Sequence, residues 1–326
     1  MSNGAGIVVA ALLSSMAAIV SGGLTTTALG AQSDQSNETS GSGAGERPQT
    51  EAPPLPFHTV EGYGGGAITP MAYLVNPGAE GSVWGKPAVA FSSVVLGHKN
   101  LRALTITETL FGRLELGYGV DRLGLGTLPD DIEDATTVDI DGDEVWLHNF
   151  NARFLLLKEG KLPALTAGVH YKFNDGIEDI DDTLGGALSS IDYDKDTGVD
   201  VTLTASKMLV ADWTFKRPVI LTGGLRNSSA GQVGLLGFGD DRSTTFEGSI
   251  AVLPMNWLLV AYEYRQKTNP YDEIAGLIED EDDWHTVDVS WIVNSHATLV
   301  AGWGAFGNVT NETENETWWF QAKYEF

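Results

Sequence analysis

The chain of 326 residues contains no cysteine and has few basic residues, 19 Lys and Arg against 44 Asp and Glu. The absence of cysteine excludes a disulfide framework, a cysteine nucleophile and a thiolate metal site. The shortage of basic residues leaves a net charge of −25, which argues against a nucleic-acid partner because phosphates would be repelled. The chain also lacks an apolar run of about 18 residues, so no membrane-spanning helix is expected.

The N-terminal region is typical of a leader followed by a linker. Residues 7–20 are small or apolar, and the small residues at 28–31 suit a signal peptidase. We therefore expect residues 1–31 to be a signal peptide, with a buried core helix as the alternative. The leader lacks a positive n-region, since the first basic residue is Arg47. Residues 32–57 are rich in Ser, Gly, Pro and Glu, which predicts a flexible periplasmic linker.

Beyond residue 80, apolar and polar side chains alternate with a period of two. In the last segment Trp318, Phe320 and Tyr324 share one face, while Lys323 and Glu325 share the other. This pattern predicts strands with one apolar and one polar surface. Such segments cover 86–96, 100–109, 112–123, 144–158, 161–174, 197–210, 215–230, 242–253, 256–269, 282–294, 296–307 and 316–326. They are longer than typical globular strands and suit tilted membrane-spanning ones.

The connections between these segments alternate in length. Short turns follow residues 158, 210, 253 and 294, whereas long connections occupy 124–143, 174–197, 231–241, 270–281 and 308–315. Outer-membrane barrels have short periplasmic turns and long extracellular loops. We therefore predict an all-β fold, a single antiparallel transmembrane β-barrel over residues 58–326 in the bacterial outer membrane. About twelve strands are expected, with ten or fourteen as alternatives, and a soluble β-sandwich or propeller is the competing fold.

The negative charge is concentrated in the long connections. Residues 124–143, 174–197, 270–283 and 308–316 hold 25 acidic residues and one basic residue, so the remainder of the chain is almost neutral. An acidic rim at the outer mouth would attract cations and repel anions.

Closely spaced carboxylates in these loops also suit Ca²⁺ or Mg²⁺. The residues concerned are Asp139, Asp141, Asp143, Asp192, Asp194 and Asp196. A solvated acidic surface is the better supported interpretation, and no other cofactor is expected.

Aromatic residues near the strand ends support the membrane interpretation, because amphipathic rings form girdles at membrane interfaces. The tryptophans concerned are Trp84, Trp146, Trp213, Trp257, Trp284, Trp318 and Trp319. The chain ends in Phe326 after an alternating strand, an ending that resembles the recognition signal of the barrel-insertion machinery. The expected partners are therefore that machinery, outer-membrane lipid and lipopolysaccharide, while the oligomeric state is left open.

Several local strings resemble an uncharacterised bacterial family, a domain of unknown function regarded as outer-membrane β-barrel proteins. They are EGYGGGAITP at 61–70, LFGRLELGY at 110–118, GLLGFGDD at 234–241, AYEYR at 261–265 and DDW at 282–284. Their order and spacing over about residues 58–326 carry the resemblance, since no single string is specific. It implies the fold and the membrane but no activity, so no catalytic residue can be transferred.

The polar faces of the predicted strands would line the lumen. The charged side chains expected there are Arg113, Glu115, Arg153, Lys172, Glu247, Glu263, Arg265, Asp288, Lys323 and Glu325. They would form either a constriction that selects solutes or paired charges that fill a narrow barrel. The Gly-rich stretch within residues 58–75 predicts either a plug folded into the barrel or a periplasmic lead-in.

The leading hypothesis for function is passive passage of small solutes, because the predicted inner face is polar. The alternative is a non-conducting envelope or adhesion protein that acts through its acidic loops. We do not expect an enzyme, because none of the six histidines lies in a motif that nominates a nucleophile partner.

Overall fold

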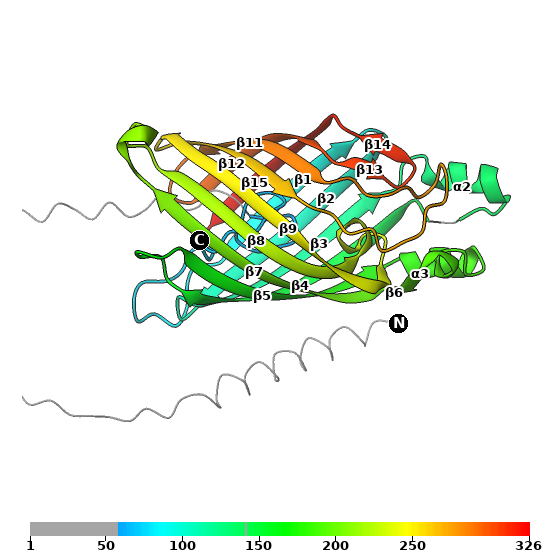
Figure 1. The fold of residues 1–326 in the computed structure, drawn as a ribbon, viewed down its shortest axis with the longest axis horizontal. Coiled ribbons are helices and arrows are strands. Elements are labelled where there is room, and N and C mark those ends of the chain that lie inside the picture. Colours follow the sequence, from blue (N-terminus) through cyan, green and yellow to red (C-terminus); the bar gives the residue numbers. More distant parts are fainter. Residues whose placement is uncertain (1–57, 141) are drawn as a thin grey trace, which may run out of the picture. The chain divides into compact units, whose positions relative to one another are not determined.

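The computed structural model describes residues 58–140 and 142–326. The expected signal peptide (1–31) and linker (32–57) lie outside the described residues, as does Asp141. The described chain forms a closed antiparallel β-barrel whose wall has twelve strands (Figure 1). The prediction of an all-β antiparallel barrel of twelve strands is therefore confirmed, and the soluble sandwich and propeller are excluded.

The wall is built from strands that each pair with the next wall strand in sequence. They are β1 (Ala88–Leu96), β2 (Lys99–Leu110), β3 (Leu114–Gly124), β4 (Glu144–Leu157), β5 (Ala164–Asp175), β7 (Thr197–Leu209), β8 (Val219–Ala230), β9 (Phe238–Met255), β10 (Leu258–Arg265), β11 (Trp284–Ile292), β12 (Ala297–Ala305) and β15 (Thr317–Glu325). β1 pairs with β15 and closes the ring, with Ala88 opposite Glu325. Closure leaves the wall without an unpaired edge, which a bilayer requires.

The connections differ between the two ends of the barrel. At the turn end they are short, as at residues 256–257 and 293–296, although one includes η2 (Asp212–Thr214). The other end, called the loop end, carries α2 (Leu128–Thr136), α3 (Ile177–Thr183), η1 (Ser189–Ile191), β6 (Tyr193–Lys195), η3 (Gly231–Gly234), β13 (Gly307–Val309) and β14 (Glu312–Glu314) (Figure 1). No helix among the described residues has both the length and the apolar character needed to cross a membrane.

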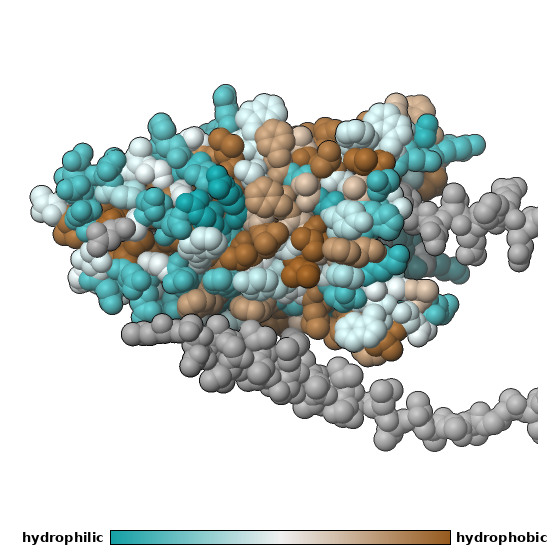
Figure 2. Space-filling model, turned by 180° about the vertical axis from the view of Figure 1, so that it is seen from behind, coloured by the Kyte–Doolittle hydropathy of each residue, from teal (hydrophilic) through white to brown (hydrophobic). Residues whose placement is uncertain are grey.

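Side chains alternate across the wall, and the outward ones are apolar. On β15, Trp318 and Phe320 are 57% and 55% exposed, whereas Lys323 and Glu325 are buried. A barrel in water would bury its apolar face, so this reversal indicates apolar surroundings outside the wall. Figure 2 shows hydrophobic residues across the wall and hydrophilic residues gathered at the loop end.

The connection between β8 and β9 differs from the prediction. The prediction of a long outer loop over 231–241 is wrong, because β9 begins at Phe238 and only residues 231–237 connect the two strands. This short connection is buried, including the side chains of Val233, Leu235 and Leu236. An outer loop would leave these apolar side chains in water, so they fold inward over the lumen.

Candidate functional site: the filled lumen

Residues 58–75, called the inner segment, lie inside the barrel. All of them are buried except Tyr73, which is half-buried. They hydrogen-bond to wall residues on opposite parts of the ring, including Thr107 on β2, Ser206 on β7 and Gln321 on β15. A segment that reaches strands around the whole wall occupies the lumen.

Glycines allow the inner segment to approach the wall closely. A Cβ on Gly117 of β3 would lie 2.0 Å from the carbonyl oxygen of Gly62. A Cβ on Gly66 would lie 2.1 Å from Oε2 of Glu263 on β10. Gly62 also has a φ of +88°, a conformation that side chains disfavour. The Gly-rich sequence therefore allows close contact with both backbone and side chains of the wall.

Glu61 places the only carboxylate of the inner segment against three cationic side chains of the wall. Its oxygens lie 2.6 Å from Nζ of Lys172 on β5, 2.6 Å from Nη1 of Arg265 on β10 and 3.5 Å from Nη1 of Arg226 on β8. Tyr63 donates a further hydrogen bond to Glu61 at 2.6 Å. All five side chains are buried, where charges are stable only when paired. This cluster therefore ties the inner segment to three strands.

Two wall carboxylates bind the backbone of the inner segment. Glu115 on β3 accepts hydrogen bonds from the N–H groups of Gly64 at 3.1 Å and Val75 at 2.7 Å. Glu263 accepts bonds from the three N–H groups of residues 67–69 at 2.6, 3.2 and 2.9 Å. Hydrogen bonds from N–H groups to a carboxylate are stronger than those between neutral groups. The backbone of the inner segment therefore helps to stabilise the buried carboxylates of Glu115 and Glu263.

Most of the charged side chains predicted for the lumen are buried on the inner side of the wall: Glu115, Arg153, Lys172, Glu247, Glu263, Arg265, Asp288, Lys323 and Glu325. Arg113 lies instead in the exposed turn before β3. The alternation that places Glu115 inward does not extend into this turn, because residue 113 precedes the strand.

Three charged residues at the centre of the lumen, Glu61, Asp200 and Arg226, were not predicted from the sequence. Arg226 contacts Asp200 at 3.0 Å and Glu247 at 3.1 Å, but the Gly- and Ser-rich β8 shows no clear polar face. Glu61 lies outside every predicted strand. One signal was available, since a single carboxylate in a Gly-rich apolar segment needs a partner wherever that segment is buried.

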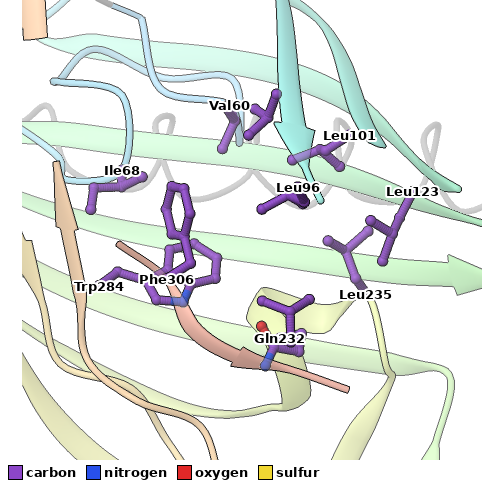
Figure 3. Close-up of a pocket in the computed structure, with 11 residues that line it drawn as sticks. Val60, Ile68, Leu96, Leu101, Leu123, Gln232, Leu235, Trp284 and Phe306 are labelled. Atoms are coloured by element: carbon purple, nitrogen blue, oxygen red, sulfur yellow. The ribbon is translucent and has the colours of Figure 1, made fainter. Parts of the chain in front are cut away.

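An apolar layer lies above the inner segment at the loop end. It encloses a cavity of about 40 Å³ lined by residues that include Val60, Ile68, Leu235, Trp284 and Phe306 (Figure 3). The rings of Trp284 and Phe306 meet edge to face with centroids 4.8 Å apart. The lumen is therefore closed twice, by polar contacts around Glu61 and by apolar contacts at the loop end.

Two of the tryptophans predicted for the interface girdles are buried instead, Trp284 at 8% and Trp319 at 2% exposure. Trp284 packs against Phe306, and its ring centroid lies 4.3 Å from Nζ of Lys267. Trp319 points inward because its neighbour Trp318 holds the outward position in the alternation. The others described are exposed: Trp84, Trp146, Trp257 and Trp318.

The acidic loops bring no three potential metal ligands together in residues 58–140 and 142–326. Asp139, Asp143, Asp192 and Asp194 are exposed, and Asp196 is half-buried. Asp141 lies outside the described residues, and a divalent cation at 139–143 or at 192–196 stays a prediction.

At the loop end, the carboxylate of Glu312 raises the pKa of His98. In the β1–β2 turn, Nδ1 of His98 lies 2.6 Å from Oε1 of Glu312, and Nζ of Lys99 lies 2.8 Å from Oε2. The hydrogen bond to Glu312 and its charge raise the pKa of His98. Partial burial opposes ionisation of Glu312, but the hydrogen bonds and charges of His98 and Lys99 lower its pKa. The contact fastens β14 to the β1–β2 turn.

A closed barrel with an apolar outer belt and a polar inner face defines a bacterial outer-membrane β-barrel protein. The predicted localisation is thereby confirmed. The chain belongs to the family described as "Protein of unknown function (DUF3034)", whose model matches residues 56–323. The predicted resemblance to an uncharacterised barrel family is confirmed at this level, while the individual strings are not tested by the match.

Several solved structures are similar in fold. The KdgM porin in complex with disordered oligogalacturonate has 12% identity and a TM-score of 0.44, covering 73% of this chain and 99% of that one. The NanC porin has 10% identity and a TM-score of 0.44, covering 74% and 98%. An outer membrane channel from Pseudomonas putida F1 has 12% identity and a TM-score of 0.42, covering 76% and 97%. No curated protein matches the chain. At these values the likeness carries no conclusion about solute or activity.

Proposed function

We propose that this protein is a gated outer-membrane channel for small solutes that the inner segment closes. The observation that carries the proposal is the polar attachment of that segment, above all of Glu61 to Lys172, Arg226 and Arg265. Removing the segment would leave a charged wall that water can fill, as in a channel. Buried ion pairs are not needed to fill a barrel permanently, because apolar side chains of similar volume are often equally stable.

The acidic connections at the loop end form the outer mouth of the proposed channel. They would concentrate cations there and deplete anions, with an effect that weakens as salt rises. Phe326, which follows β15, is exposed and accessible to the proposed partners, outer-membrane lipid and the barrel-insertion machinery. The proposed activity is transport without catalysis.

Planar-bilayer recordings of three proteins test the proposal: the full chain, a variant lacking 58–75, and that variant with 231–236 replaced by a short Gly-Ser turn. We expect the full chain to be mostly silent and at least one variant to give stable current steps. Deleting 34–51, a stretch of equal length before the inner segment, is the matched control and should stay silent. Heat-modifiable gel mobility verifies that each barrel is folded.

The alternative function is a non-conducting envelope or adhesion protein. It is favoured by the second, apolar closure at the loop end, which includes Trp284 and Phe306. Silence of all the folded variants would overturn the channel and support this alternative. Equal steps from the full chain and the variants would keep the channel but remove the closing role of the inner segment.

A further inference from the structure

The three cationic side chains around Glu61 converge on one carboxylate from three different strands. Lys172, Arg226 and Arg265, called the cation site, are each at least 96% buried. We infer that the cation site binds the carboxylate group of a small organic acid, and that Glu61 occupies this site while the barrel is closed. The inference deepens the proposed function, because it names organic carboxylates as the solutes that compete with the inner segment.

The charges of the wall alone do not balance at the cation site. Lys172 and Arg226 contact two wall carboxylates, Asp200 and Glu247, whereas the ion pair of Arg265 is with Glu61. Glu61 supplies the third negative charge from the inner segment. When the segment leaves, the site lacks one anion, and a buried uncompensated charge is costly.

Arg265 depends on the inner segment more than the other two cations do. Among the described residues, its hydrogen bonds go to Oε2 of Glu61 at 2.6 Å and to the carbonyl of Ile68 at 3.2 Å. Lys172 and Arg226 have a partner that does not leave with the segment, because both contact the wall carboxylate of Asp200, at 2.9 and 3.0 Å. Displacement of the segment therefore frees the Arg265 guanidinium, which is suited to bind both oxygens of a carboxylate.

Further donors point to the same place. Arg226 Nη2 donates to the hydroxyl of Tyr63 at 2.7 Å, and Lys172 Nζ lies 2.6 Å from Glu61. Both bonds end on the inner segment and would be released with it. An incoming carboxylate thus meets Arg and Lys donors that are already positioned by the wall, which lowers the cost of ordering them.

The acidic rim does not prevent this selection. Its field is screened over about 8 Å at physiological salt, whereas the cation site is buried within the lumen. The rim would lower the rate at which anions enter, and the site would decide which of them are retained.

Chemical rescue of Glu61→Ala in the full chain tests the inference. The substitution leaves space for acetate beside Arg265, and we expect it to lower the temperature at which the detergent-solubilised barrel loses its heat-modifiable mobility. Sodium acetate should raise that temperature with saturation, whereas acetamide and sodium chloride at equal ionic strength should not. Adding Arg265→Ala should weaken the apparent acetate affinity about tenfold or more. Glu312→Ala, which removes a carboxylate at the loop end, is the matched control and should show no saturable response.

Equal shifts with acetate, acetamide and chloride would overturn the inference. If Glu61→Ala does not fold, hydrogen exchange of residues 58–75 in the unmodified chain replaces it. Acetate should then increase exchange of the segment while acetamide does not, and equal exchange in both would again overturn the inference. Neither thermal stability nor hydrogen exchange depends on conductance. If acetate rescues Glu61→Ala but no variant conducts in a bilayer, the proposed channel is contradicted and the carboxylate site is not.

Discussion

The carboxylate of Glu61 lies 2.6 Å from Nζ of Lys172, although 111 positions separate the two residues in the chain. Both side chains are buried, so parting them leaves uncompensated charges unless water or a solute replaces the partner. The filling of this lumen therefore depends on a few polar contacts, and these contacts are what solvent or an anion could replace.

Substitution of Glu61 by Gln should release the inner segment while preserving its size. Removing one partner of a buried charge group costs about 3–5 kcal/mol. Hydrogen exchange of residues 58–75, followed by mass spectrometry, should rise in this variant while exchange of the wall strands stays unchanged. Glu133→Gln on the exposed part of α2 makes the same chemical change and should leave exchange at the unmodified level. Unchanged protection of 58–75 in Glu61→Gln would show that the cluster does not hold the segment.

Substitution of Gly117 by Ala should push the inner segment away from β3. The added Cβ would lie 2.0 Å from the carbonyl oxygen of Gly62, which is backbone and cannot rotate aside. Overpacking of this kind costs about 1–3 kcal/mol. Limited proteolysis should cut near residues 58–75 faster than in the unmodified protein. Gly160→Ala has no atom within 4 Å of its added Cβ, so a similar increase there would refute the proposed contact.

The contact between His98 and Glu312 predicts a pH dependence at the loop end. Because the folded pKa of His98 is raised above the ordinary value of 6.5, the contact is fully present below that value. It is lost as pH rises through the higher folded pKa. An NMR titration of His98 in detergent micelles should give a pKa above about 6.5, and Glu312→Gln should lower it. A pKa for His98 that Glu312→Gln leaves unchanged would contradict the assignment.

The outward side chains should tolerate charge according to their depth in the membrane. Leu104 lies in the middle of β2 and is 52% exposed, so Leu104→Arg should destabilise the barrel by about 2–4 kcal/mol in lipid. Phe111 is similarly exposed but lies in the turn after β2, where Phe111→Arg should cost about 0–1 kcal/mol. Urea unfolding in lipid vesicles measures both, and equal costs would argue against this placement of the membrane.

The strands were predictable because each wall residue faces either the apolar outside of the barrel or its polar inside, which makes the sequence alternate. On β15 the exposed Trp318 and the buried Lys323 follow the period-two pattern, and β4 begins at the predicted residue 144. Errors arose where the alternation stops. Arg113 belongs to a turn, and β9 extends back to Phe238 because the connection before it folds inward.

The lumen contents were less predictable, because their partners lie far apart in the chain. Nothing in the local sequence of Glu61 indicates that Lys172, Arg226 and Arg265 converge there, since each comes from a separate strand. The Gly-rich stretch predicted close backbone contact, and Gly62 and Gly117 form it. The sequence did not decide whether this stretch lies in the lumen or in the periplasm, because glycine packs against any backbone.

A reversible covalent bond between the inner segment and the wall tests most directly whether this segment closes the barrel. The N–H of Ala72 donates to Oγ of Ser206 at 2.8 Å, so cysteines at these two positions would join the segment to β7. The natural chain has no cysteine, so this pair would form the only disulfide, here in a chain that also carries Glu61→Gln and the Gly-Ser replacement of 231–236 that removes the apolar closure. In a planar bilayer we predict silence under oxidising conditions and stable current steps after a reductant is added. Current steps of equal size and frequency before and after reduction would contradict the claim that the inner segment closes the barrel.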